Sequence, residues 1–241
     1  MRRAPGLQVT RQYNASPGGS TGAWIGEGLV YLKGNEPHHP YKLANEYIAG
    51  RLAAALGIPC PPGDIVELYD GKLGYGSLGV LNHGQTVAPP DIYEVGRKNP
   101  NFAAGVLVFD EWIINPDRND ENVIWWPGRK PYIIDHEKAL FGTTGNIPSK
   151  IALRDKFVTG GHPFRSIVSR PNIVQWCLEV ERLSSAAVRS AIEQARSWQL
   201  ITETQSNDLM ATLFLRKRDI RRLVLNEPAT FPGTLFGEEE T

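Results

Sequence analysis

The chain has 241 residues, of which 41% are apolar and 22% are charged, and its 26 basic side chains balance 26 acidic ones. This composition indicates an ordinary globular protein that is long enough to bury a sizeable core. The net charge of zero gives no reason to expect bulk binding to nucleic acid or to an anionic membrane surface.

Targeting patterns and cysteine usage favour a cytoplasmic protein without membrane association. No apolar run approaches the roughly eighteen residues that a transmembrane helix requires. The basic start at Arg2 and Arg3 has no apolar segment behind it, which argues against a signal peptide. Cys60 and Cys177 stand far apart without a CxxC pattern, so we interpret them as reduced buried thiols, with a disulfide or metal pair as the alternative.

The first part of the chain predicts short strands and one helix. Residues 1–15 indicate an extended arm with a first strand, and residues 16–22 form a loop that contains three glycines. Two apolar runs, at 23–25 and 29–33, are joined by a Gly-Glu-Gly turn and predict a hairpin. Apolar residues at helical spacing, followed by a glycine, predict a helix over 43–56.

The middle of the chain predicts a second hairpin, a linker and a buried helix. Strands at 65–69 and 78–81 flank an Asp-Gly-Lys turn. Residues 82–100 are rich in Pro, Asn and Gly and mark our candidate boundary between two lobes. The strongly apolar run 102–114 predicts a helix that ends at Asn115-Pro116.

The remainder predicts two short strands, at 123–126 and 132–134, followed by helices from about residue 171. Four hydroxyl residues are candidate helix caps: Ser184 or Ser185 for a helix through Ser197, and Thr202 or Thr204 for one through Asn226. Residues 231–241 are expected to form a flexible acidic tail.

Basic residues and histidines have ordinary interpretations. The last helix carries a basic run, Arg216, Lys217 and Arg218 with Arg221 and Arg222. We interpret this run as a solvated face, with contact to a partner or to RNA as the alternative. The histidines form no metal-binding pattern: His38, His39, His83 and His162 are expected in loops, and His136 is expected to be structural or to orient Asp135.

The most informative stretch runs from Asn115 to His136. It places Asp117, then Asn122 five residues on, and then Asp135 at the end of a short apolar strand. Protein kinases use such a set, in which one Asp orients or deprotonates the attacking hydroxyl, and the Asn and the second Asp hold the Mg²⁺ that bridges the ATP phosphates. A polar turn is the alternative, but these groups would converge at an electrostatic cost without a cation.

Upstream of this stretch stand a strand lysine, Lys33, and a helix glutamate, Glu46. Kinases pair such residues so that the lysine reaches the α- and β-phosphates. Taken alone, Lys33 could be a surface lysine and Glu46 a residue that complements the helix dipole. The glycine loop could cover phosphates or be a flexible turn, and it lacks the Gly-Lys-Ser/Thr of a Walker loop; its residues of interest are Gly18, Gly19, Ser20, Thr21 and Gly22.

The sequence resembles the HipA-like kinases, in particular their compact bacterial branch. The matching segments are Val30–Lys33, Asn45-Glu46, Leu56–Pro59, Phe109–Asn115, Asp117-Arg118 with Asn122, Ile134–His136 and Ala139–Phe141. The Asp-Arg-x-x-x-Asn loop also resembles that of phosphatidylinositol kinases, which carry a His where this chain has Asn119. His136 stands where protein kinases have the Phe-Gly that follows the metal-binding Asp.

The resemblance implies an α+β, two-lobed protein-kinase-like fold, with a small β-rich N-lobe at 1–82 and a larger, mostly helical C-lobe at 83–230. It implies ATP and Mg²⁺ as cofactors and transfer of the γ-phosphate to a Ser/Thr hydroxyl of a protein. The roles that it assigns are phosphate binding by Lys33, support of Lys33 by Glu46, catalysis by Asp117, and metal binding by Asn122 and Asp135.

Regulation and partners are also implied by the resemblance. Family members can be toxins that phosphorylate a translation component, which suggests an antitoxin or another operon-encoded partner. Some members autophosphorylate in the glycine loop, where Ser16, Ser20 and Thr21 are the candidate acceptors here. Two alternatives stay open: a kinase of the same fold that acts on a small molecule or lipid, and a nucleotide-binding pseudokinase or partner-binding module that uses the basic C-terminal helix.

Overall fold

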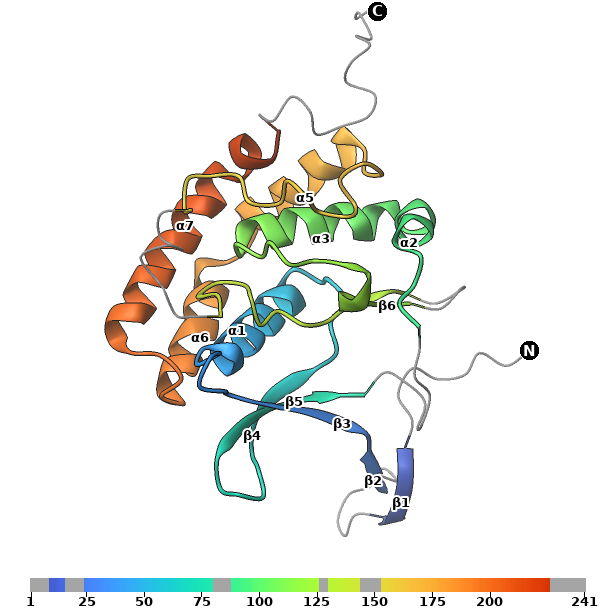
Figure 1. Cartoon of the computed structure of the whole chain (residues 1–241), viewed down its shortest axis with the longest axis vertical. Helices are drawn as coiled ribbons and strands as arrows, with labels where there is room; N and C mark the ends of the chain where they lie inside the picture. Colours follow the sequence, from blue (N-terminus) through green and yellow to red (C-terminus); the bar gives the residue numbers. More distant parts are fainter. Residues whose placement is uncertain (1–8, 16–23, 80–87, 126–129, 144–152, 226–241) are drawn as a thin grey trace, which may run out of the picture.

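The computed structural model describes residues 9–15, 24–79, 88–125, 130–143 and 153–225. Within these ranges most strands lie toward the lower end of Figure 1 and most helices toward the upper end, and the short strands at 123–124 and 132–133 lie between them. The predicted glycine loop and the predicted acidic tail lie outside the described residues. None of the described helices combines the length and the hydropathy needed to cross a membrane.

The strands of the described ranges form three small antiparallel sheets. The first pairs β1 (Val9–Ala15) with β2 (Trp24–Gly28). The second has the order β3-β5-β4 and contains β3 (Val30–Gly34), β4 (Gly63–Glu67) and β5 (Leu73–Leu78). The third is a short ribbon of β6 (Val123–Ile124) and β7 (Tyr132–Ile133).

The predicted hairpin over residues 23–33 is wrong. β2 pairs with β1, whereas β3 pairs with β5, so the two runs belong to different sheets. The backbone of Leu29, between them, accepts a hydrogen bond from Gly79 beyond β5 rather than closing a turn. The Gly-Glu-Gly segment therefore continues β2 and does not reverse the chain.

The second predicted hairpin is confirmed as β4 and β5, although β5 begins five residues earlier than the predicted strand at 78–81. Tyr75 on β5 points toward the helix α1 (Lys42–Ala55). A Cβ atom added to Gly63 would lie only 2.2 Å from the Tyr75 hydroxyl oxygen. A Cβ atom added to Gly50 of α1 would lie 3.1 Å from the same oxygen. These two glycines let the aromatic ring pack closely between β4 and α1.

The helices largely follow the sequence pattern. The predicted helices are confirmed as α1, α3 (Pro100–Trp112), α5 (Arg170–Arg182), α6 (Ser185–Ser197) and α7 (Glu203–Leu225). Ser184 caps α6 by accepting a hydrogen bond from the Ala186 amide. Thr202 and Gln205 exchange two side-chain to backbone hydrogen bonds at the start of α7, as in a capping box.

The helix α2 (Ile92–Lys98) was not predicted. It lies in the Pro-rich stretch that we took as a linker. Asp91 caps it by accepting hydrogen bonds from the amides of Tyr93 and Glu94. The signal was therefore present as an Asp followed three residues later by a Glu, but the surrounding prolines and glycines masked it.

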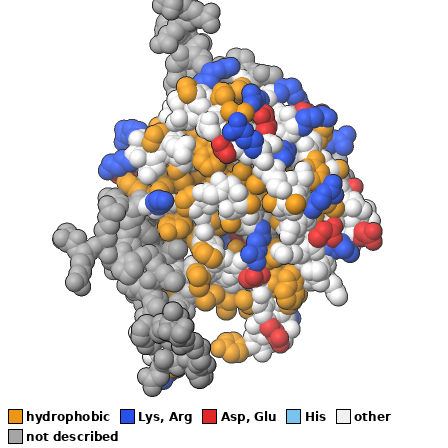
Figure 2. Space-filling view, turned by 180° about the vertical axis from the view of Figure 1, so that it is seen from behind, with side chains coloured by type: hydrophobic (Ala, Val, Ile, Leu, Met, Phe, Trp, Pro, Cys, Tyr) orange, Lys and Arg blue, Asp and Glu red, His pale blue; other side chains and the backbone are white. Residues whose placement is uncertain are grey.

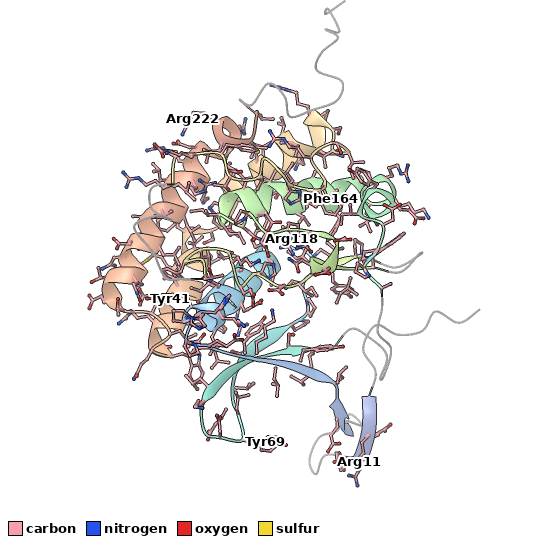
Figure 3. The ribbon with its side chains drawn as sticks, in the orientation of Figure 1. Arg11, Tyr41, Tyr69, Arg118, Phe164 and Arg222 are labelled. Atoms are coloured by element: carbon pink, nitrogen blue, oxygen red, sulfur yellow. The ribbon has the colours of Figure 1, made fainter. Side chains whose placement is uncertain are left out.

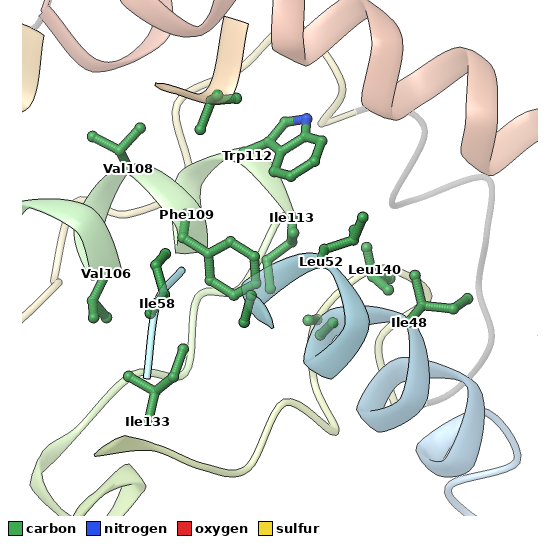
Figure 4. Packing of buried hydrophobic residues seen from close by; sticks show 14 of the residues in the cluster. Ile48, Leu52, Ile58, Val106, Val108, Phe109, Trp112, Ile113, Ile133 and Leu140 are labelled. Carbon is green, nitrogen blue, oxygen red and sulfur yellow. The ribbon is translucent and has the colours of Figure 1, made fainter. Parts of the chain in front are cut away.

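One hydrophobic cluster joins the helices to the inner face of the β3-β5-β4 sheet. In Figure 4, Phe109 of α3 and Ile113, the residue after α3, lie on the side of Leu52 of α1. Trp112 lies on the side of α7, where its Nε1 donates to the Leu213 carbonyl at 3.0 Å. On its other side, α1 packs against α6, where Tyr47 donates a hydrogen bond to Gln194 at 2.7 Å. The helix that carries Glu46 is thus fixed from both sides.

Candidate active site

A cleft separates the β3-β5-β4 sheet from the β6-β7 ribbon. Its cavity has a volume of about 380 Å³. The walls are mostly apolar and include Cys60, Pro61, Val123 and Ile134, whereas Lys33, Glu46 and Asp135 bring charge to one side. An apolar cavity with a few convergent polar groups is the usual form of a small-molecule site.

Lys33 reaches this cavity because of the alternation of β3. It stands opposite Tyr75 in the sheet register and on the same strand face as Tyr31, and all three side chains line the cavity. Lys33 Nζ lies 2.5 Å from Glu46 Oε1 and 3.0 Å from Asp135 Oδ1. Burial alone would lower the pKa of Lys33, but the two carboxylates outweigh it and the pKa is raised.

Glu46 lies on the buried face of α1, with 4% of its side chain exposed. Burial would raise its pKa, but the contacts with His136 and Lys33 lower the pKa to about 2. His136 Nδ1 is 3.5 Å from Glu46 Oε2, and its buried Nε2 has no hydrogen-bond partner among the described residues. His136 therefore contacts Glu46, while Asp135 next to it contacts Lys33.

Asp135 and Asn122 meet at one end of the β6-β7 ribbon. The register pairs Val123 with Ile133, and the Ile134 amide donates to the Asn122 carbonyl at 3.1 Å. Asp135, the next residue, has a positive φ of 57°. Asp tolerates this left-handed conformation better than most residues, and such conformations are common at functional sites.

The residues at this point fit Mg²⁺ bound together with phosphate. They offer a carboxylate that is one-third exposed and a carboxamide, both of which are oxygen donors. Among the described residues no group of three or more His, Cys, Asp or Glu side chains could hold a metal ion by itself. A Mg²⁺ ion here would complete its coordination with phosphate oxygens and water, which is its usual mode in nucleotide-dependent enzymes.

Asp117 lies in the loop that precedes β6 and is not among the residues that line the cavity. Asn122 Nδ2 donates to the Asp117 carbonyl at 2.9 Å, so the carboxamide holds the loop that carries Asp117. The Asp117 carboxylate is 34% exposed, and its Oδ1 lies 2.8 Å from Lys138 Nζ. Asn122 thus links the two segments: its side chain contacts the Asp117 backbone, and its own carbonyl accepts from the residue before Asp135.

Arg118 fixes this loop from below, and its role was missed in the sequence. Figure 3 shows it near the centre of the molecule, beneath α3. Its Nε and Nη2 donate to the carboxylate of Asp110 at 2.8 and 3.0 Å, while Nη1 donates to the carbonyls of Asn122 and Ile134. The guanidinium is fully buried, and it ties the residues that flank β6 and β7, Asn122 and Ile134, to α3.

The end of α3 sets the direction of the loop. The Asn115 amide donates to the Asp110 carbonyl and the Ile114 amide donates to the Glu111 carbonyl, which is the Schellman pattern. The left-handed position of this motif is usually a glycine, but here it is Ile114, with φ of 57°. A buried β-branched residue in this conformation is strained, as is often found beside functional sites.

Asn45 of α1 holds the segment that follows Asp135. Its Nδ2 donates to the carbonyls of Glu137 and Gly142, and its Oδ1 accepts from the Phe141 amide. The side chain is fully buried. Neighbouring residues of α1 therefore fix both parts of the charged cluster, because Glu46 contacts Lys33 and Asn45 fixes the chain after Asp135.

The prediction of a solvated basic run on the last helix is wrong for Arg216. This residue is buried, forms an ion pair with Glu111 at 2.5 Å, and donates to backbone carbonyls of α3 and of residues 153–156. His162 lies in a loop, as predicted, but it is buried, with Nε2 3.1 Å from Asp110 Oδ2. The two adjacent acids inside the apolar run 102–114 were the signal for both contacts, because buried carboxylates require partners.

The predicted residues of the glycine loop, Gly18, Gly19, Ser20, Thr21 and Gly22, lie outside the described residues, as does Ser16. The remaining predicted site residues are described. The structure brings Lys33, Glu46 and Asp135 into one charged cluster. Asn122 contacts the residue before Asp135 through its backbone and Asp117 through its side chain, and neither Asn122 nor Asp117 lines the cavity.

The chain matches the family described as HipA-like kinase over residues 16–150, which is more than half of its length. The curated proteins gave no match. Among solved structures, the Helicobacter pylori proinflammatory kinase CtkA is similar with 13% identity and a TM-score of 0.53, and the match covers 80% of this chain and 86% of that one. At this identity the similarity shows the fold.

A second solved structure is the toxin–antitoxin complex of HipA, HipB and operator DNA from Shewanella oneidensis MR-1. The match has 12% identity and a TM-score of 0.46, and it covers 92% of this chain. This chain spans 65% of the length of that one.

Proposed function

This chain belongs to the HipA-like kinase family, and we propose that it is an ATP-dependent phosphotransferase that transfers the γ-phosphate to a Ser/Thr hydroxyl of a protein. The observation that carries the proposal is the position of Lys33 between Glu46 and Asp135, at 2.5 and 3.0 Å, on the wall of a cavity of about 380 Å³. This volume falls in the range of small-molecule sites. The α+β fold that the chain shares with CtkA supports the same reading.

In this proposal the two sides of the cleft bind different parts of the nucleotide. The apolar side, with residues such as Pro61 and Val123, suits the flat face of a base, and the charged side suits the phosphates. Lys33 would contact the α- and β-phosphates while Glu46 keeps its ammonium in place. Asn122 and Asp135 would hold Mg²⁺. The bound ion would neutralise the negative charge that develops on the phosphate oxygens.

Asp117 would act on the acceptor. Its carboxylate is 34% exposed, so a hydroxyl group can approach it from solvent. In the transfer step the hydroxyl oxygen forms a bond to the γ-phosphorus, the bond from that phosphorus to the bridging oxygen breaks, and ADP leaves. The hydroxyl proton moves to Asp117. Positioning and charge neutralisation account for most of the catalysis in such enzymes.

The substrate and partners remain part of the proposal. A protein acceptor and a toxin role with an antitoxin partner are suggested by the family, and a small-molecule or lipid acceptor is the alternative within the same chemistry. The basic face of α7 is less suited to partner binding than its sequence suggests, because Arg216 is buried and both Arg221 and Arg222 form ion pairs with carboxylates.

The proposal is tested by measuring transfer from γ-labelled ATP, in the presence of Mg²⁺, to the protein itself and to lysate proteins. Asp117→Ala and Asp135→Ala should each reduce transfer by about 10³-fold or more. Asp135→Ala should also weaken Mg²⁺-dependent ATP binding, whereas Asp117→Ala should leave it largely intact. Asp120→Ala, which removes an exposed carboxylate from the same loop, is the matched control. Transfer at the wild-type rate in either active-site variant contradicts the assignment.

A further inference from the structure

Lys138 is a charged residue beside the proposed site to which none of the roles above applies. It stands three residues after Asp135, and its Nζ lies 2.8 Å from Asp117 Oδ1. Both side chains are accessible, with 43% of Lys138 and 34% of Asp117 exposed. Whatever approaches the Asp117 carboxylate from solvent therefore meets the ammonium group of Lys138.

The loop of Asp117 does not supply such a cation. Asn119, two residues on, uses both ends of its carboxamide inside the loop: Nδ2 donates to the Asp117 carbonyl and Oδ1 accepts from the Glu121 amide. Arg118 points to the other side and binds Asp110. In the part of the chain that the structure describes, Lys138 is the cationic side chain that forms an ion pair with Asp117.

The backbone around Lys138 is firmly held. The neighbouring residues Ala139 and Leu140 are buried, and the Leu140 amide donates to the Ile113 carbonyl at the end of α3. Asn45 of α1 binds the carbonyls on both sides of this turn, at Glu137 and Gly142. The turn thus fixes the position from which the Lys138 side chain extends to Asp117.

Lys138 is expected to be protonated at neutral pH. The hydrogen bond with Asp117 raises the pKa of Lys138, and the nearby carboxylates of Glu137 and Asp135 raise it further. The side chain is therefore an ammonium at neutral pH. A persistent cation next to the proposed catalytic carboxylate suits a reaction in which negative charge develops on transferred oxygens.

We propose that Lys138 is a catalytic residue that contacts the γ-phosphoryl group during transfer, in addition to its ion pair with Asp117. The proposal rests on the proposed function. For Asp117 to take the proton of the acceptor, the attacking oxygen must lie within hydrogen-bond distance of its carboxylate, and the γ-phosphorus lies just beyond that oxygen. The Nζ atom of Lys138 lies 2.8 Å from the same carboxylate, and it is therefore a cation close to the path of the transferred phosphoryl group.

The chemistry of the step is balanced without any change in Lys138. The acceptor oxygen bonds to the γ-phosphorus, the bond to the bridging oxygen breaks, ADP carries away the electron pair, and the acceptor proton ends on Asp117. Lys138 stays an ammonium throughout. As Asp117 is neutralised by the proton, its attraction for Lys138 weakens, and the phosphoryl oxygens become the stronger partner for the cation.

A purely structural tether would behave differently from a phosphate-contacting cation. An exposed ion pair contributes little to stability. The γ-phosphate contact, in contrast, distinguishes ATP from ADP. The informative measurements are therefore the turnover number and the ratio of the dissociation constants of ATP and ADP, both with Mg²⁺, in the full chain.

The experiment compares Lys138→Met and Lys138→Arg with Lys72→Met. Lys72 forms a similar ion pair with Asp70, at 2.7 Å and more exposed than that of Lys138, in the β4–β5 turn away from the cavity, and serves as the control. Lys138→Met should lower the turnover number by about 10²-fold or more. It should also weaken ATP binding by about 3- to 10-fold while leaving ADP binding unchanged. Lys138→Arg should keep part of the activity because it keeps the charge.

The outcomes separate this proposal from the proposed function. Turnover by Lys138→Met at the level of Lys72→Met overturns the role of Lys138, and so does an equal loss of ATP and ADP affinity. If the wild-type protein binds ATP but transfers no phosphate, the proposed function fails. The ratio of the ATP and ADP dissociation constants then tests whether Lys138 contacts the γ-phosphate. A ratio that falls in Lys138→Met supports the γ-phosphate contact, and an unchanged ratio excludes it.

Discussion

The protein contains two clusters of acidic and basic side chains that differ in their access to water. In the cleft cluster, formed by Lys33, Glu46 and Asp135, the lysine and the aspartate have 31% and 35% of their side chains exposed. In the cluster under α3, the pairs Asp110–Arg118 and Glu111–Arg216 have side chains that are fully buried. Figure 4 shows buried apolar residues of α3, the helix that carries Asp110 and Glu111.

This difference in exposure indicates different roles for the two clusters. The buried cluster matches each carboxylate with a guanidinium, and Arg216 also donates to the carbonyls of Leu153 and Lys156. The cleft cluster offers two carboxylates to one lysine, which leaves room for another cation. We infer that the buried cluster fixes the chain segments and that the cleft cluster exchanges contacts with a ligand.

The surface away from these clusters has a third kind of charge distribution. In Figure 2 the basic and acidic side chains of the back face are interspersed among apolar ones. Exposed pairs such as Arg221 with Glu181 belong to this group, and Figure 3 labels Arg222 at the outer end of α7. Pairs of this type contribute at most about 1 kcal/mol to stability. They therefore serve as controls for the two clusters.

The largest expected effect comes from breaking the buried cluster. Arg216→Met should lower the free energy of unfolding by about 3–5 kcal/mol, because it leaves Glu111 charged and buried and removes donors from several carbonyls. Urea unfolding at neutral pH measures the change. Arg221→Met, on the same helix but in an exposed pair, should cost less than about 1 kcal/mol. Equal losses in the two variants would remove the distinction between the clusters.

Breaking the cleft cluster should reverse the pattern. Lys33→Met should reduce phosphate transfer by at least about 100-fold, because the phosphates lose their lysine. Its free energy of unfolding should change by only about 1 kcal/mol, since water can replace Lys33 at Asp135 and His136 still contacts Glu46. The same urea and transfer assays apply. A stability loss as large as that of Arg216→Met would show that the cleft pair is structural.

The smallest expected effect is a dependence of stability on pH that comes from His162. Burial lowers the pKa of His162 below its ordinary value of 6.5, and its Nδ1 accepts from the Phe164 amide, so the folded protein holds the neutral ring. Below pH 6.5 the unfolded chain binds a proton that the folded state does not. Stability should therefore fall as pH decreases from 7 to 5, by up to about 1.4 kcal/mol per pH unit.

A substitution isolates this contribution. His162→Gln should flatten the slope, whereas His38→Gln, which changes an exposed histidine, should not. The cleft pair should contribute nothing to the slope in this range, because the pKa of Glu46 is lowered to about 2 and that of Lys33 is raised. The stabilisation from Glu46 should be lost only as the pH falls below its ordinary pKa of 4.5 toward 2. An unchanged slope in His162→Gln would contradict this assignment.

The sequence predicted features that depend on local patterns. Most helices follow from apolar periodicity and caps, and the order of Lys33, Glu46, Asp117, Asn122 and Asp135 indicated which residues could meet. The partners of β2 and β3 could not be predicted, because strand pairing depends on contacts that are distant in sequence and the Gly-rich turn between them was a misleading local signal.

The buried cluster was missed for a different reason. A basic run on a helix usually faces solvent, but Arg216 lies on the apolar face of α7, three residues after Leu213 and four before Ile220, whereas Arg218 is largely exposed. A second signal lay in Asp110 and Glu111 within an apolar helix. Two adjacent carboxylates that must be buried require cations from other segments, but the sequence does not say which ones. The contact of Lys138 with Asp117 carried no sequence signal at all.

The most direct test of the central claim is a calorimetric titration of ATP into the wild-type protein, with and without Mg²⁺, and into Lys33→Met. If the cleft cluster is the nucleotide site, the wild type should bind one ATP per chain more tightly with Mg²⁺ than without it, and Lys33→Met should bind much more weakly while remaining folded. Absence of ATP binding by the wild type with Mg²⁺, or binding that is unchanged in Lys33→Met, would contradict the account.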